Sequence, residues 1–211
     1  MPEKILCHLC GQRPARRACP KLEREICAQC CGEEREQSIG CPLDCPYLRE
    51  AREHEKLPPF DARTLPHREI ELTARFMEQN QELAIVLGRL LLMASMETPG
   101  AVDADVREAL ESLVTSAKTA ESGLIYEAAP GNVIAGGVVS RFREELTKFR
   151  EEMAKRAPER PVSDKALLGV LIFWQRTEYQ RSNGRRKGRS FIESLFGLLP
   201  PPADPNAQPS A

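Results

Sequence analysis

Aromatic residues and histidines are scarce in this sequence, and common enzyme motifs are missing. Only 5% of the 211 residues are aromatic, and the three histidines share no motif. A large core must therefore be built mainly from Leu, Ile, Val and Ala, and acid–base chemistry has few candidate residues. The sequence has no P-loop, G-x-G-x-x-G, H-E-x-x-H or nucleophile-elbow motif. We therefore expect a protein that is not an enzyme.

Long apolar runs are missing as well. The longest apolar stretch, residues 83–96, contains Arg89 and is too short to cross a bilayer. The first four residues lead directly to cysteines rather than to the apolar run of a signal peptide. We expect a soluble cytoplasmic protein that does not bind membranes.

The chain also lacks an excess of charge of one sign. Its formal net charge is −1, which gives no general attraction to nucleic acid or to anionic membranes. Residues 1–56 hold ten basic and ten acidic residues, whereas a domain that grips phosphates is normally basic. This balance favours a protein-binding or purely structural role for the N-terminal segment.

Cysteine is absent from residues 46–211, so all eight cysteines lie between Cys7 and Cys45. In a reducing cytosol disulfides are disfavoured, and clustered cysteines then indicate a metal site. In a secreted protein the same eight cysteines would instead form four disulfide bridges. The cellular compartment decides between these interpretations, and nothing else in the sequence suggests export.

Two C-x2-C pairs, Cys7/Cys10 and Cys27/Cys30, carry the strongest metal-binding pattern. Two residues between the thiolates form a tight turn that places both sulfurs on one side of a zinc ion. Gly11 and Gly32 follow the two pairs, and we expect both to adopt the positive φ that such turns require. The two pairs together predict one tetrahedral four-cysteine site.

The other four cysteines are sufficient for a second tetrahedral site. Their order along the chain implies that the two sites interleave as a cross-brace. A segment of this length cannot bury enough apolar surface to fold alone, so bound metal would supply its folding free energy. We expect two zinc ions, the second held by Cys19, Cys31, Cys41 and Cys45.

The cysteine order resembles that of the cross-braced HIT and MYND zinc fingers. In those fingers the third and fourth ligands usually form their own C-x2-C pair, whereas here Cys19 has no such neighbour and Cys31 is the spare cysteine. The last pair is usually His-x3-Cys there and is Cys41-x3-Cys45 here. The stretch from Cys19 to Arg52 also resembles the N-terminal segment of a group of cysteine-rich bacterial proteins, a resemblance that implies no activity.

Iron–sulfur ligation is an alternative to zinc, but ferredoxins use a compact C-x2-C-x2-C run that Cys27, Cys30 and Cys31 do not match. Eight thiolates fill two sites completely, whereas a catalytic zinc keeps one position for water. We therefore expect the zinc ions to be structural.

The rest of the chain has helical periodicity and no segment with the period of a strand. We expect a mainly α protein, with a cysteine-rich zinc-binding domain at 1–57, an all-α helical domain at 58–199 and a disordered proline-rich tail at 200–211. The expected helices cover residues 47–56, 66–96, 105–122, 133–156, 164–181 and 190–198.

Positive charge is concentrated in the segment 181–189, which contains no acidic residue. One interpretation is an anion site for RNA, DNA or a phosphate, assisted by the N-terminus of the helix that begins at Ser190. The interpretation that we favour is a solvated turn that pairs with residues 97–127, where seven acidic residues face two basic ones. The candidate anion-binding residues are Arg181, Arg185, Arg186, Lys187 and Arg189.

These features favour a non-enzymatic zinc-binding adaptor or regulatory protein that acts through contacts with a protein partner. The first alternative is a nucleic-acid-binding protein that uses residues 181–189. The second is a redox sensor that releases zinc when its thiolates are oxidised.

Overall fold

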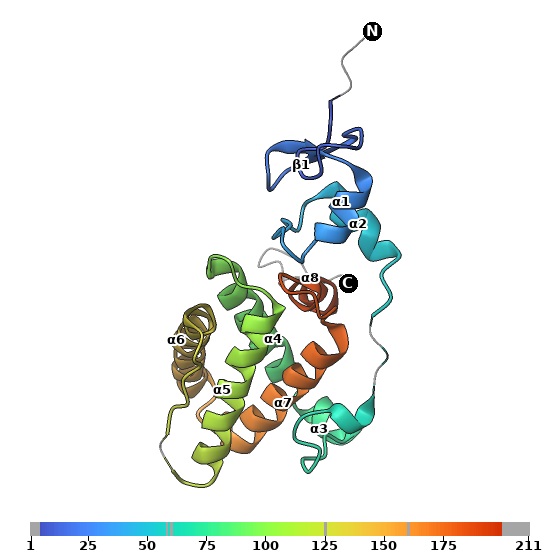
Figure 1. Ribbon diagram of the computed structural model, residues 1–211. Helices are drawn as coiled ribbons and strands as arrows, with labels where there is room; N and C mark the ends of the chain where they lie inside the picture. The colour runs from blue at the N-terminus through green and yellow to red at the C-terminus, as the bar shows by residue number, and fades with distance from the viewer. Residues whose placement is uncertain (1–4, 58, 60, 125, 160, 200–211) are drawn as a thin grey trace, which may run out of the picture.

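The computed structural model describes residues 5–57, 59, 61–124, 126–159 and 161–199, and within them the chain is mainly helical (Figure 1). This confirms the expected fold class. The predicted tail at 200–211 lies outside the described residues. The elements are β1 (Arg17–Cys19), β2 (Arg24–Ile26), α1 (Ala28–Glu34), α2 (Pro46–Glu53), the 3-10 helix η1 (Ala62–Thr64), α3 (Ala74–Gln79), α4 (Gln81–Glu97), α5 (Asp103–Glu121), α6 (Val133–Arg156), α7 (Asp164–Arg181) and α8 (Ser190–Leu198).

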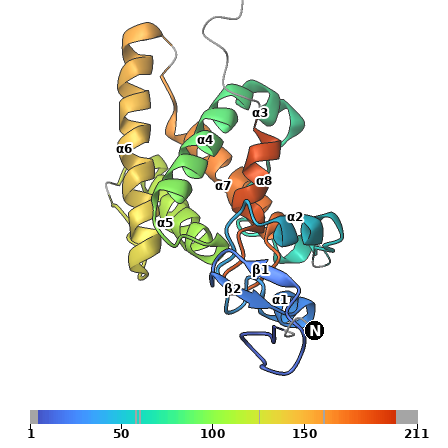
Figure 2. The same ribbon diagram turned by 90° about the horizontal axis from the view of Figure 1, so that it is seen from above.

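The buried residues form two separate clusters. The smaller cluster lies within residues 7–48 and consists of the cysteines with Ile26, Ile39 and Leu48. The larger cluster lies between helices α4 to α8. Figures 1 and 2 show the cysteine-rich segment at one end of the molecule, beside α8, with the long helices packed next to it. None of the described helices is long and apolar enough to span a membrane.

The larger core depends on close approaches between helices at glycines. The indole of Trp174 lies against Gly88, and a Cβ at Gly88 would come within 2.3 Å of its Cζ2 atom. The Nε1 of Trp174 donates a hydrogen bond of 2.9 Å to the carbonyl of Ala84. A Cβ at Gly169 would likewise lie 2.3 Å from Cζ of Phe76. These contacts fix how α3, α4 and α7 fit together.

The single helix predicted for 66–96 is wrong at its beginning and at Asn80. Residues 66–73 are not helical, α3 is short, and Asn80 separates it from α4. The guanidinium of Arg176 on α7 donates to the carbonyls of Pro66, His67 and Ile70 at 3.1, 2.6 and 2.8 Å. A helix would use these carbonyls internally, and its backbone could not include the positive φ of 53° at His67.

Candidate metal centre

The sulfurs of Cys7, Cys10, Cys27 and Cys30 all lie within 4.8 Å of one another, so this group can hold a metal ion. Three of the side chains are buried, and Cys10 is partly exposed. All eight cysteines of the chain are free thiols rather than disulfides. The structure therefore brings together the four residues that the two C-x2-C pairs predicted as one site.

The first pair lies on a tight turn between two short extended segments. The N–H of Cys7 donates to the carbonyl of Arg13, and the N–H of Ala15 donates to Ile5, each at 2.8 Å. The N–H of Gly11 closes the turn on the carbonyl of Cys7 at 2.8 Å, and Gly11 has the expected positive φ of 62°. These bonds orient both sulfurs toward the second pair.

The second pair lies at the beginning of α1, after the hairpin of β1 and β2. Cys27 is the N-cap residue, and its sulfur accepts the N–H of Cys30 at 3.3 Å. Gly32 lies within α1, so the positive φ that we expected there is wrong. Once Cys27 caps the helix, the residues that follow continue as helix and need no left-handed residue. The N–H of His8 donates to the carbonyl of Glu25 at 3.0 Å and so ties the first turn to β2.

Hydrogen-bond donors surround these sulfurs and favour their thiolate forms. The backbone N–H groups of Gln12 and Arg13 lower the pKa of Cys10 to about 6. The N–H of Cys30 lowers the pKa of Cys27. Although the guanidinium of Arg13 lowers the pKa of Cys30, burial and the neighbouring sulfurs raise it to about 12.

The effect of neighbouring sulfurs on the pKa of Cys30 bears on whether a metal ion fits the site. Four thiolates at such short range repel one another, and a divalent cation among them removes that repulsion. Four sulfur ligands in a compact group suit Zn²⁺, which is bound tetrahedrally by thiolates. The donor set and its N–H partners therefore fit a zinc ion. Bound there, the ion would link the first turn to α1.

Arg13 is a residue whose place the sequence did not indicate. It belongs to a basic stretch with Arg16 and Arg17, and nothing in the composition separates the three. In the structure its Nη2 lies 3.4 Å from the sulfur of Cys30, and its Nη1 donates to Gln29. The positive charge of Arg13 would offset part of the charge of a site with four thiolates and one zinc ion.

The remaining cysteines, Cys19, Cys31, Cys41 and Cys45, are all buried in the same small cluster. Within the described part of the chain, the first group alone brings its sulfurs within 4.8 Å of one another. Burial raises the pKa of Cys41, and the nearby charges of Cys45 and Cys19 raise it further. Arg17 Nη1 lies 3.4 Å from the sulfur of Cys31. The four residues of the predicted second zinc site therefore share one buried cluster, and the site stays a prediction.

Glu36 is the second residue that sequence reasoning missed, because it is indistinguishable by type from its acidic neighbours Glu33 and Glu34. Its side chain is 1% exposed and accepts hydrogen bonds from Arg52 Nη2 at 2.6 Å and Asn183 Nδ2 at 2.9 Å. Glu36 has a positive φ of 54° and lies in the loop between Cys31 and Cys41.

The segment 181–189 packs against the cysteine-rich segment. The N–H groups of Lys187 and Arg189 donate to the carbonyl and the carboxylate of Glu36, at 2.7 and 3.0 Å. The Arg185 guanidinium donates to the carbonyl of Arg35 at 2.6 Å, and Lys187 Nζ reaches the carbonyl of Ser38. Among the described residues, the side chains of Arg185 and Lys187 make no ion pair with the acidic residues of 97–127, which was the arrangement we favoured. Both side chains donate to backbone carbonyls instead.

The other two cations of this segment, Arg181 and Arg186, are exposed. Arg189 is partly buried, and its Nη2 lies 3.3 Å from the sulfur of Met96. The five predicted anion-binding residues are therefore divided between the contact with the cysteine-rich segment and the surface. Histidine is the other common zinc ligand besides cysteine. His8 and His54 are exposed and lie outside the four-sulfur group.

We compared the chain with protein-family models, with curated proteins and with solved structures. None of the three comparisons found a match.

Proposed function

We propose that the chain is a non-enzymatic zinc-binding adaptor or regulatory protein whose metal is structural. The observation that carries this proposal is the group of four cysteine sulfurs within 4.8 Å of one another. When all four ligands are thiolates, a tetrahedral zinc ion has no position left for water or substrate. Such an ion stabilises the fold of residues 5–57 and performs no chemistry of its own.

We further propose a second zinc ion on Cys19, Cys31, Cys41 and Cys45, which gives two ions in the chain. All four side chains are buried in the cluster that surrounds the first site. The free thiols of all eight cysteines suit the reducing cytoplasm, where we place the protein.

The adaptor role is supported by the way the zinc-binding segment joins the helical region. Asn183 donates to Glu36, and Arg52 donates to Glu193, so hydrogen bonds connect the two regions and a partner bound to either one acts on a single unit. Contacts with a protein partner need no catalytic residues. They require only a surface that is held in one shape.

Removal of the metal tests the structural role directly. Amide exchange would be followed in the zinc-loaded protein before and after a strong chelator is added. We expect residues 5–57 to lose protection while α4 to α7 stay protected, because only the small cluster depends on the ion. Unchanged protection in residues 5–57 would refute a structural metal.

The nucleic-acid alternative has one observation in its favour, the exposure of Arg181 and Arg186. Arg185 and Lys187 of the same segment already donate to the cysteine-rich segment. Titration with RNA and DNA at two salt concentrations distinguishes the two functions. Binding that weakens with salt and is lost in an Arg181→Gln, Arg186→Gln double variant would support the alternative.

A further inference from the structure

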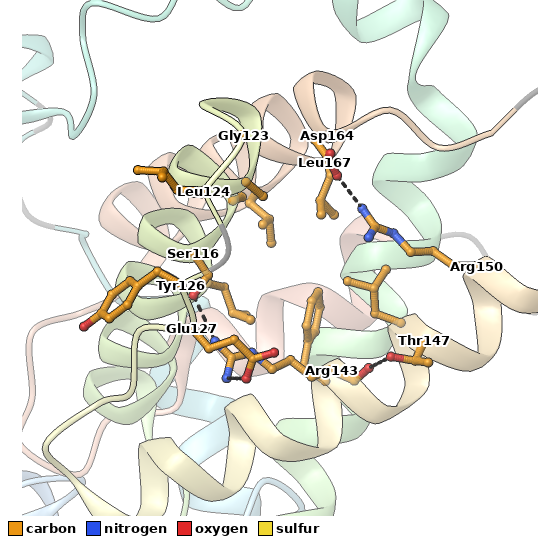
Figure 3. A pocket seen from close by; sticks show the side chains of 16 residues that line it. Ser116, Gly123, Leu124, Tyr126, Glu127, Arg143, Thr147, Arg150, Asp164 and Leu167 are labelled. Atoms are coloured by element: carbon orange, nitrogen blue, oxygen red, sulfur yellow. Dashed lines mark hydrogen bonds and ion pairs between the residues drawn. The ribbon is translucent and has the colours of Figure 1, made fainter.

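A cavity of about 500 Å³ lies between α5, α6 and α7, remote in sequence from the cysteines. Helix α5 packs closely against both α6 and α7, whereas the packing of α6 on α7 is much less extensive. Side chains from all three helices surround this space (Figure 3). Its volume falls in the range of cavities that bind small molecules.

The floor of this cavity is apolar. Six of its lining residues are buried and carry no polar side-chain atom, so they offer a dry surface to an apolar ligand. They are Leu113, Ala117, Phe142, Leu146, Leu167 and Leu171.

Two arginines of α6, Arg143 and Arg150, stand at the rim (Figure 3). Arg143 is held by Glu127 at 3.1 Å and by the hydroxyl of Ser116 at 2.9 Å. Its position is therefore fixed by hydrogen bonds. It contributes a stationary positive charge to one side of the opening.

Arg150 is accessible at the rim, where its side chain is 40% exposed. Its Nη2 donates to Asp164 at 3.0 Å, but its Nε is shielded from solvent and has no partner among the described residues. Because a ligand cannot reach an atom that water cannot reach, an incoming carboxylate would meet the outer nitrogens of this guanidinium and form a charge-assisted pair there. Asp164 is half-exposed, and ion pairs of this kind contribute little stability, so a competing carboxylate can displace it.

From these features we infer that the cavity binds an amphipathic carboxylate, with its hydrocarbon chain on the apolar floor and its carboxylate on Arg150. The apolar floor supplies affinity in proportion to the number of buried methylene groups. The guanidinium selects a carboxylate over a neutral or cationic end group. This site does not depend on the metal centre or on the proposed adaptor role.

Decanoate is a suitable probe, and calorimetric titration of the full-length zinc-loaded protein is the measurement. We expect saturable binding of one decanoate per chain. Octanoate should bind roughly tenfold more weakly, because it lacks two methylene groups. Decanol should bind at least fivefold more weakly than decanoate, because it cannot accept a charge-assisted hydrogen bond from Arg150.

Arg150→Gln should reduce decanoate binding to the level of decanol and leave decanol binding unchanged. Arg156→Gln is the matched control, since Arg156 lies on the same helix, pairs with Glu152 and does not line the cavity. Ala117→Phe should fill the floor and block both ligands, with circular dichroism used to check its fold. If decanoate does not bind, if it binds no better than decanol, or if Arg150→Gln binds it as the wild type does, the inference is overturned.

Discussion

Nη2 of Arg52 on α2 lies 2.6 Å from Oε1 of Glu36, in the loop between two of the cysteines. The same guanidinium donates through Nε to Glu193 on α8 at 2.9 Å. Arg52 and Glu36 both belong to the cysteine-rich segment, and the bond from Arg52 to Glu193 links that segment to the helical region. Asn183 completes the arrangement, with its amide nitrogen 2.9 Å from both Glu36 and Glu55.

Removal of Glu36 should therefore loosen the contact between the two regions. Glu36→Ala removes one of the carboxylates that offset the charge of the half-buried Arg52. It also removes one of the two acceptors of the Asn183 amide. We expect the free energy of unfolding to fall by about 2–3 kcal/mol. Chemical denaturation of the zinc-loaded protein measures the change.

Glu33→Ala is the matched control for that experiment, because Glu33 is exposed on α1. The free energy of unfolding of Glu33→Ala should stay within about 0.5 kcal/mol of the wild-type value. Amide exchange of residues 183–189 should increase in Glu36→Ala and not in Glu33→Ala. Equal effects of the two variants would show that Glu36 does not connect the regions.

Much of the helical region could be predicted from apolar periodicity. The helix predicted for 133–156 coincides with α6, and Val106, Leu110 and Val114, which recur at helical spacing in the helix predicted for 105–122, are fully buried. Local signals were sufficient there, because apolar residues recur at helical spacing along these segments. The four-sulfur group was equally predictable, because the geometry of a C-x2-C pair is set by only four residues.

Features that depend on contacts distant in sequence could not be predicted. The carbonyls of Pro66, His67 and Ile70 are taken by Arg176 from α7, and no residue near position 66 indicates it. The burial of Glu36 depends in the same way on Asn183 and the N–H of Arg189. A sequence shows that a residue is charged, whereas the fold determines which of several similar charges becomes buried.

Asp103 makes the stability of the helical region depend on pH. Its carboxylate accepts the N–H groups of Phe191 and Ile192 at 2.9 and 3.1 Å, and so caps the beginning of α8 from α5. Burial raises the pKa of Asp103 from 3.8 to about 7, despite those two donors. Between these pH values the folded protein retains a proton that the unfolded chain has released.

The free energy of unfolding should consequently fall as the pH rises from about 4 to about 7, since the unfolded state binds fewer protons in that range. We expect this contribution to be on the order of 2–4 kcal/mol. Asp103→Asn should remove it, so the difference between wild type and variant should change with pH. Glu121→Gln, on an exposed residue of the same helix, should follow the wild-type curve. A difference between wild type and Asp103→Asn that is constant over this range would exclude titration of Asp103.

The contact between Gly88 and Trp174 gives a prediction about core packing. Gly88→Ala places a methyl group 2.3 Å from the indole, so α4 and α7 must separate. We expect a loss of about 1–3 kcal/mol in the free energy of unfolding. The fluorescence of Trp174, the single tryptophan of the chain, should report the movement.

Gly197→Ala is the opposite case, at an exposed position of α8. Gly197 lies in α8, and a Cβ there would meet no atom within 4 Å. Alanine favours the helical backbone, so this variant should be more stable by about 0.5–1 kcal/mol. If both glycine variants are equally destabilised, the close approach at Trp174 is not the cause.

Zinc content per chain, measured by mass spectrometry of the purified protein and its cysteine variants, tests the proposed metal centre most directly. We predict about two zinc ions in the wild type and in a Ser38→Ala control. Cys10→Ser should remove one ion through the first site, and Cys45→Ser should remove the other through the second. A wild-type protein that contains no zinc, one that contains iron instead, or a Cys10→Ser variant with undiminished zinc would contradict the proposal.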